Sequence, residues 1–269
     1  LIPDAPEHEL AAFARAYPAI ADKVRGIPAR LQGGSPNPYE ATRNFFQDHG
    51  NYFHALDTAA ESLAEHLGGR QMRLTRLAAA LDRDFGYPVR FNQDVRGRSA
   101  VDRQPREIRL RAGLTEAQQC CELAYHYGTL AHGGEIAELT SPIDDPPARN
   151  VTTHGLAQYF AAAVTMPYAE VLSAAKETRY DIDVVSARFG TGFESTCQRL
   201  GTLQRPGAKA VPFVFIRTDR AGNVSKRQAT AGFHFSRSGA TCPLWVVHRA
   251  FETPNRVTRQ VSTTPDGRT

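Results

Sequence analysis

The segment from Gly155 to Pro167 constrains the fold most, because its residues, GLAQYFAAAVTMP, are apolar on nearly every side of a helix. A helix on a protein surface carries one apolar stripe and is polar on its other side, whereas a helix that is apolar all round is surrounded by other elements. We therefore predict a helix at the centre of a core, and we expect other helices to pack around it.

The first 70 residues are predicted to form helices. Asp4 is a suitable N-cap for a first helix, and Asn37-Pro38 is typical of an N-cap followed by a first-turn proline. Apolar residues then recur at helical spacing from Tyr52 to Leu67, and Gly68-Gly69 ends that helix. Because these helices contain no catalytic constellation, we interpret residues 1–70 as a helical bundle that acts as a linker or oligomerisation region.

Residues 71–204 are predicted to form a second, mainly helical unit. Thr115 is a suitable N-cap for one of its helices, and a proline-rich loop at 140–147 precedes the central helix. Two short strands lie on either side of a polar turn. The predicted elements are helices at 74–85, 115–132, 155–167, 184–189 and 193–203 and strands at 88–91 and 107–110.

The chain changes character after Gln204-Arg-Pro-Gly207, which interrupts the helical pattern. Residues 211–216 and 224–235 predict two strands joined by a turn, and residues 257–262 predict a third. We therefore expect a domain with an antiparallel sheet at 205–269. The whole chain is predicted to belong to the α+β class.

Composition restricts the partners and the environment. The 32 basic and 28 acidic residues leave a net charge of +4, and the pI is about 9.0, which allows an anionic partner. The basic residues are scattered, and none of them forms a block typical of a DNA-binding arm. The chain has no run of about 18 apolar residues and no targeting segment at Leu1, so we expect a cytoplasmic fragment that enters no membrane. The four cysteines form no C-x-x-C pair and are interpreted as buried free thiols.

The helix predicted at 115–132 has the position, but not the ligands, of a zinc-peptidase helix. In an H-E-x-x-H motif the two histidines hold zinc and the glutamate is the general base. The matching five positions here run from Tyr125 to Thr129 and read YHYGT. A scaffold that keeps its shape but lacks these ligands is better suited to binding than to cleavage, so we predict no catalytic residue and no metal ligand.

The order of these elements resembles the IrrE/ImmA family of zinc peptidases. The resemblance is carried by Leu123-Ala124, by Gly128, and by the helix end from Phe160 to Pro167. It implies that the two histidine ligands fall on Tyr125 and Thr129, the general base on His126 and the third ligand on Leu156. The expected module at 71–204 is therefore a degenerate zincin. A metal-dependent peptidase with non-standard ligands is the alternative function, and a purely structural oligomerisation module is a third.

Further blocks resemble the short-chain fatty acyl coenzyme A regulators of the PrpR and RamB type, in which such a module follows a helix-turn-helix. These blocks are Pro38–Glu40, Asn51–Asp57, Cys197–Ala208, Val211–Phe213, Arg220–Arg227, Gly232–Phe235 and Cys242–Trp245.

The resemblance implies a transcription regulator that senses coenzyme A or a short-chain acyl coenzyme A, with propionyl coenzyme A expected, and that controls propionate, methylcitrate or glyoxylate metabolism. It also implies DNA binding through a helix-turn-helix before Leu1, a [4Fe-4S] cluster held by a segment after Thr269, and a homo-oligomer.

Coenzyme A needs cations for its phosphates and a flat face for adenine. In a regular strand from Val224 to Arg237, Lys226, Gln228 and His234 share one face, which is polar and basic. The same alternation also suits a solvated sheet face. Tyr125 and His126 provide a second wall, although both side chains also suit a core. The predicted ligand-binding residues are Tyr125, His126, Arg217, Lys226, Arg227, His234 and Arg237.

Overall fold

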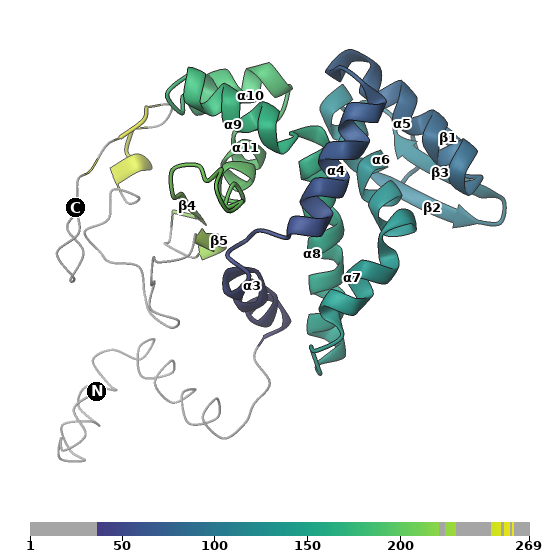
Figure 1. The fold of residues 1–269 in the computed structure, drawn as a ribbon, viewed down its shortest axis with the longest axis horizontal. Helices are drawn as coiled ribbons and strands as arrows, with labels where there is room; N and C mark the ends of the chain where they lie inside the picture. Colours follow the sequence, from purple (N-terminus) through teal and green to yellow (C-terminus); the bar gives the residue numbers. More distant parts are fainter. Residues whose placement is uncertain (1–36, 221–223, 230–248, 254–255, 259, 261–269) are drawn as a thin grey trace.

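The computed structural model describes residues 37–220, 224–229, 249–253, 256–258 and 260 (Figure 1). The first helices are α3 Pro38–Asp48, α4 His54–Leu67 and α5 Arg70–Phe85, and the strands that follow are β1 Val89–Asn92, β2 Ser99–Arg103 and β3 Arg106–Arg111. Helices α6 Glu116–Ala131, α7 Gly133–Thr140, α8 Pro146–Thr165, α9 Tyr168–Glu177, α10 Ile182–Phe189 and α11 Phe193–Leu200 come next. Strands β4 Val214–Thr218 and β5 Val224–Ala229 complete the described elements. The predicted α+β class, with a helical module and a separate antiparallel strand pair, is confirmed.

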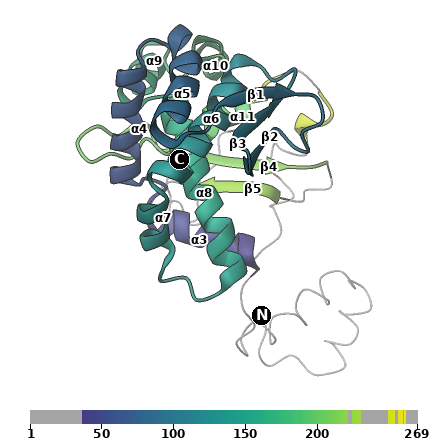
Figure 2. The same cartoon turned by 90° about the vertical axis from the view of Figure 1, so that its right-hand side faces the viewer.

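Helix α8 lies at the centre of the main core, as its apolar sequence predicts. Helices α3, α4, α6 and α7 all pack against it (Figures 1 and 2). Phe160, Ala161 and Val164 are fully buried in this core. The helix begins nine residues before the predicted Gly155, at Pro146, because Asp145 caps it and a proline is favourable in a first turn.

Local capping signals correctly identified the starts of α3 and α6 and the ends of α4 and α5. The Asn37 side chain accepts a bond from the backbone of Tyr39 at the start of α3. Thr115 and Gln118 form a reciprocal capping box at the start of α6. Gly68 and Gly86 end α4 and α5 with positive φ angles of 74° and 69°, which glycine adopts without a steric penalty.

The small sheet departs from the prediction, because three strands are present in the order β1-β3-β2. Strands β1 and β3 are parallel, so a tight turn cannot join them. The segment between them contains β2, which pairs with β3 as an antiparallel hairpin. Strand β2 has the sequence SAVDR, whose short polar pattern gave little sign of a strand. Ile108 and Leu110 of β3 join the core around α8.

A second core lies between α9, α10 and α11. Val171, Val185 and Leu200 are fully buried there. Helix α9 was not predicted, although the proline at position 167 both ends the preceding helix and precedes the new one. The hairpin β4–β5 is antiparallel as predicted, and β5 contacts α3.

The core around α8 contains residues from both sides of the domain boundary expected at residue 70. Phe53, Leu56 and Ala60 pack in the same cluster as Leu81 and Phe160. Residues 53–67 therefore share one core with the module that follows them.

Several sequence predictions lie wholly or partly outside the described residues. They are the helices of residues 1–36, the second strand beyond Ala229 and most of the third strand at 257–262, of which Val257, Thr258 and Gln260 are described and are not in a strand. Within the described part of the chain, no helix is long and apolar enough to cross a bilayer.

The crossing of α6 and α8 depends on Gly128. A Cβ atom at this position would lie 2.6 Å from Cδ1 of Phe160. We expect Gly128→Ala to lower the free energy of unfolding by about 1–3 kcal/mol, because overpacking forces the ring or the helices to move. Gly134→Ala is the control, since no atom lies within 4 Å of its added Cβ. Urea unfolding of the two variants checks the prediction, and equal stability would show that the helices do not need this close approach.

Candidate functional site

The positions expected for metal ligands are Tyr125 and Thr129 of α6 and Leu156 of α8. Their side chains do not fit a zinc ion. Leu156 of α8, at the third ligand position, is fully buried and has no donor atom. The Thr129 hydroxyl donates a hydrogen bond to the Tyr125 carbonyl at 2.8 Å. Among the described residues, no group of three or more His, Cys, Asp or Glu side chains is placed to hold a metal. Tyr125, Thr129 and Leu156 therefore do not form the three-ligand zinc site that the resemblance would place at their positions.

Tyr125 pairs with His154 of α8. Its hydroxyl is hydrogen bonded to His154 Nδ1, and the two rings are nearly parallel, with an angle of 8° and centroids 6.1 Å apart. Burial raises the pKa of Tyr125, which keeps its hydroxyl protonated at neutral pH. Tyr125 is half-buried and His154 is exposed, so the pair forms an aromatic surface between the two helices.

His126 faces the small sheet and is buried. Its Nε2 lies 2.8 Å from Ser99 Oγ, and Ser99 donates to Glu122 Oε2 at 2.6 Å. Because the hydroxyl gives its single proton to Glu122, Nε2 of His126 must be the donor to Ser99. Burial lowers the pKa of His126 to about 4, so the ring is neutral at pH 7. The residue at the general-base position thus links α6 to β2.

Arg217 and Lys226 lie together on the hairpin β4–β5, where they are register partners. Both contact one carboxylate of α11: Lys226 Nζ is 2.5 Å from Glu194 Oε1, and Arg217 NH1 is 3.1 Å from Oε2. The hydrogen bond from Lys226 is the largest cause of a lowered pKa at Glu194. Gln228 also donates to α11, to the carbonyl of Gln198 at 3.1 Å. Lys226 and Gln228 share a face as predicted, and that face packs on a helix.

The other three predicted ligand-binding residues cannot be placed in a site. Arg227 is described through its backbone, which pairs with Ile216, and His234 and Arg237 lie outside the described residues. The structure also separates the two predicted walls. Tyr125 and His126 interact with α8 and β2, whereas Arg217 and Lys226 interact with α11.

A buried ion pair that sequence reasoning missed joins α4 to α11. Asp57 and Arg199 are 0% and 1% exposed, and Asp57 Oδ2 lies 2.7 Å from Arg199 NH1. Tyr159 of α8 donates to the same carboxylate oxygen at 2.6 Å, and Arg199 Nε donates to the Met166 carbonyl at 2.9 Å. Burial raises the pKa of Tyr159 well above its usual range. Three helices therefore meet at one carboxylate.

Arg205 extends this network along the loop after α11. It donates to Tyr52 Oη at 3.0 Å and to Glu61 Oε2 at 2.7 Å, and its guanidinium lies 4.0 Å from the centre of the Tyr168 ring. Four of the network residues, Tyr52, Asp57, Arg199 and Arg205, come from two blocks, Asn51–Asp57 and Cys197–Ala208, that carry the family resemblance. The sequence did contain a sign of this ion pair, because Asp57 and Arg199 are charged residues on the otherwise mostly apolar buried faces of α4 and α11.

The three described cysteines are thiols. Burial raises the pKa to about 11 for Cys120 and Cys197 and to about 12 for Cys121. The prediction of buried free thiols is confirmed for Cys120 and Cys197, whereas Cys121 is a free thiol that is only partly buried. Cys242 lies outside the described residues.

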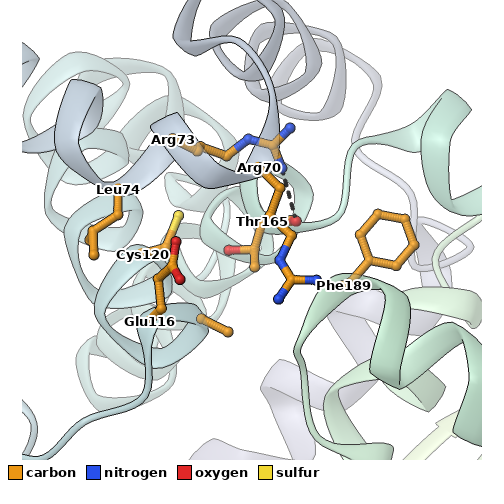
Figure 3. Close-up of a pocket in the computed structure, with 8 residues that line it drawn as sticks. Arg70, Arg73, Leu74, Glu116, Cys120, Thr165 and Phe189 are labelled. Carbon is orange, nitrogen blue, oxygen red and sulfur yellow. Dashed lines mark hydrogen bonds between the residues drawn. The ribbon is translucent and has the colours of Figure 1, made fainter.

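A small recess lies beside Cys120, between α5, α6 and the end of α8 (Figure 3). Arg73, which is 3% exposed, crosses it and donates to the Thr165 carbonyl at 3.2 Å, and it also contacts Glu170 at 3.2 Å. The recess has room for about one water molecule. The recess is too small for a coenzyme. The hydrogen bond from Arg73 to the Thr165 carbonyl ties α5 to the end of α8.

Comparisons with known families match two parts of the chain. Residues 84–201 match the IrrE N-terminal-like domain, and residues 202–269 match the family described as "Short-chain fatty acyl coenzyme A regulator, C-terminal".

Similar proteins include transcription regulators. The chain is 41% identical to the HTH-type transcriptional regulator PrpR of Mycobacterium tuberculosis, over 97% of this chain and 56% of that protein. It is 34% identical to RamB of the same organism, over 97% and 60%. It is 40% identical to the propionyl-CoA carboxylase regulator of Cereibacter sphaeroides, over 86% and 50%. The chain thus spans about half the length of these curated relatives.

A solved structure has the same fold. A Mycobacterium tuberculosis transcriptional regulator matches with a TM-score of 0.81 and 41% identity, over 86% of this chain and 72% of that one.

The buried ion pair should dominate stability. We expect Arg199→Met to lower the free energy of unfolding by about 3–5 kcal/mol, because it removes the main counter-charge of a buried carboxylate. Arg188→Met is the matched control, since it breaks an ion pair with Glu177 in which both side chains are about half exposed. Exposed pairs contribute little, so the control should unfold like the native chain. Equal urea midpoints for the two variants would contradict a structural role for the pair.

Stability should also depend on pH through His126. Its pKa is about 4 in the folded chain, against about 6.5 for an unperturbed histidine. Between these values the unfolded chain binds a proton that the folded chain does not, so stability falls as pH drops from 6.5 to 4. The loss is on the order of 3 kcal/mol.

Urea unfolding of the native chain and of His126→Gln across this range isolates the effect, because the variant should show a smaller pH dependence. His66→Gln, a change at an exposed histidine, is the control. An identical pH dependence for the native chain and His126→Gln would rule out a buried neutral imidazole.

Proposed function

Because the chain belongs to the short-chain fatty acyl coenzyme A regulator family, we propose that it is the ligand-sensing region of a bacterial transcription regulator. The proposed ligand is coenzyme A or a short-chain acyl coenzyme A. One relative is named a propionyl-CoA carboxylase regulator, which supports propionyl coenzyme A as the first ligand to test. Control of propionate, methylcitrate or glyoxylate genes in the cytoplasm is the corresponding biological role.

The proposal depends on one observation: the peptidase-like module keeps its helix packing but lacks the residues that hydrolysis needs. Residues 84–201 match the IrrE N-terminal-like domain, and the α6–α8 crossing is tightly packed. At the positions of the metal ligands and base, however, stand a tyrosine, a histidine bonded to Ser99, a threonine and the buried Leu156. Intact packing without the reactive groups favours binding over hydrolysis. A metal-dependent peptidase with other ligands remains the alternative, for which stoichiometric zinc and chelator-sensitive cleavage are the required observations.

The proposed partners follow from the family. DNA would be bound by a helix-turn-helix, and a [4Fe-4S] cluster by a cysteine-rich segment, each in parts of the protein beyond this chain. A homo-oligomer is proposed, with residues 1–70 contributing its surface. Binding changes an assembly only if the ligand has different affinities for its two states. The network at Asp57 supports a route for this change, because it connects α4 with the start of the segment matched to the regulator family.

Ligand binding should stabilise the chain. At 100 times its Kd, propionyl coenzyme A should raise the free energy of unfolding by about 2.7 kcal/mol, because it binds only the folded state. Thermal shift with propionyl, acetyl and free coenzyme A measures this effect, with propionate alone as the control. An unchanged Tm with all three coenzyme A compounds would contradict the proposed function and favour a structural oligomerisation module.

A further inference from the structure

The small sheet β1-β3-β2 and its loops carry the excess positive charge of the chain. Residues 90–111 contain seven arginines and three acidic residues, which gives this segment a net charge of +4. The whole chain also has a net charge of +4, so the remaining residues are neutral overall. Basic residues that look scattered along the sequence are therefore concentrated on one element of the fold.

The sheet has one face toward the core and one face toward solvent. Ile108 and Leu110 of β3 are buried in the core around α8, so alternation along the strand places Arg109 and Arg111 on the opposite face. Arg90 of β1 is the register partner of Arg109 and shares that outer face. Arg90 and Arg111 are exposed, and in Figure 1 the sheet lies at the right-hand side of the molecule, beside α5 and α6. The outer face is thus a flat surface that presents guanidinium groups.

Two pairs of arginines are direct neighbours across strands. Arg90 is opposite Arg109, and Arg103 is opposite Arg106 at the tip of the β2–β3 hairpin. Like charges opposite each other destabilise a sheet. These arginines are therefore not explained by a contribution to the stability of the sheet.

Most of these cations have no acidic partner within the fold. Among the residues that the structure describes, no carboxylate forms an ion pair with Arg90, Arg103, Arg106 or Arg111. Arg109 differs, because its Nε lies 2.7 Å from Asp102 Oδ2. Four exposed guanidinium groups are left to contact an anionic partner from outside this part of the chain.

The chemistry of this surface fits phosphate groups arranged along a surface. A guanidinium group binds phosphate oxygens through two parallel hydrogen bonds. Duplex DNA presents a dense row of phosphates, and a protein that neutralises them gains affinity by releasing counterions. The hydrogen bond between His126 and Ser99 ties β2 to α6, so the surface is fixed to the rest of the module.

We propose that the outer face of the sheet β1-β3-β2, together with the hairpin tip, binds the phosphate backbone of duplex DNA. The residues that make this contact are Arg90, Arg103, Arg106 and Arg111. This assignment rests on the proposed function, because a transcription regulator is held at DNA, and it adds a second contact to the helix-turn-helix proposed beyond this chain. Contacts to phosphates carry no base information, so the sheet adds affinity beside the operator and leaves sequence recognition to the other domain.

Fluorescence anisotropy of the whole chain with a labelled duplex of random sequence, measured at several salt concentrations, tests the proposal. The face variant Arg90→Gln/Arg111→Gln should weaken binding about tenfold and reduce the slope of log K against log salt by about 1.8, since each phosphate contact contributes about 0.9. Arg43→Gln/Lys176→Gln is the matched control, because it removes the same charge at exposed residues of α3 and α9. The control should bind DNA like the native chain.

The tip variant Arg103→Gln/Arg106→Gln should lose affinity in the same way as the face variant. Its urea midpoint should not fall, because the substitution removes a like-charge neighbour pair, and the same holds for the face variant. Loss of affinity without loss of stability therefore identifies a binding surface rather than a damaged fold.

Three results would overturn the proposal. They are a native chain that does not bind the duplex, sheet variants that bind it as tightly as the native chain, and an equal loss in the control, which would show that binding follows net charge alone. Polyglutamate is the competitor that tests an acidic protein as the partner, and displacement of the duplex as effective as that by unlabelled DNA would also contradict the DNA assignment. A chain that binds propionyl coenzyme A but not DNA would leave the proposed function intact, whereas one that binds DNA through the sheet but no coenzyme A compound would support the surface alone.

Discussion

The ion pair between Asp57 and Arg199 is the interaction on which the arrangement of the helices depends. Neither side chain reaches solvent, so each charge is stable only beside the other. The pair requires α4 and α11 to meet at the end of α8, where the Met166 carbonyl and the Tyr159 hydroxyl complete the contacts. Arg205 then ties the following loop to the same carboxylate. One interaction thus joins the core around α8 to the core of α9, α10 and α11.

The peptidase-like module keeps its packing because its fold does not depend on metal ligands. Gly128 and Phe160 determine the close approach of α6 and α8, while His126 and Ser99 connect α6 to the sheet. These contacts use van der Waals packing and neutral hydrogen bonds, which no ion needs to complete.

Local signals predicted most helices, whereas long-range pairing was harder to read. The capping residues Asn37 and Thr115 act within one turn of their own helices, so sequence is sufficient to recognise them. Strand β2 is stabilised by pairing with β3 and was missed, because its own residues have a weak strand pattern. The buried ion pair was also missed, since Asp57 and Arg199 are 142 residues apart in the sequence and are brought together only by the packing of the helices.

The sequence by itself determined that α8 would be central, that α6 lacks zinc ligands, and that the chain resembles the acyl coenzyme A regulators, since each of these depends on residue identity and local spacing. Only the tertiary structure decided which charges would be paired. It placed Glu194 between Arg217 and Lys226, and it placed Asp57 between Arg199 and Arg205. The physical reason is that charge pairing and cavity shape depend on distances between separate elements, which a linear pattern does not specify.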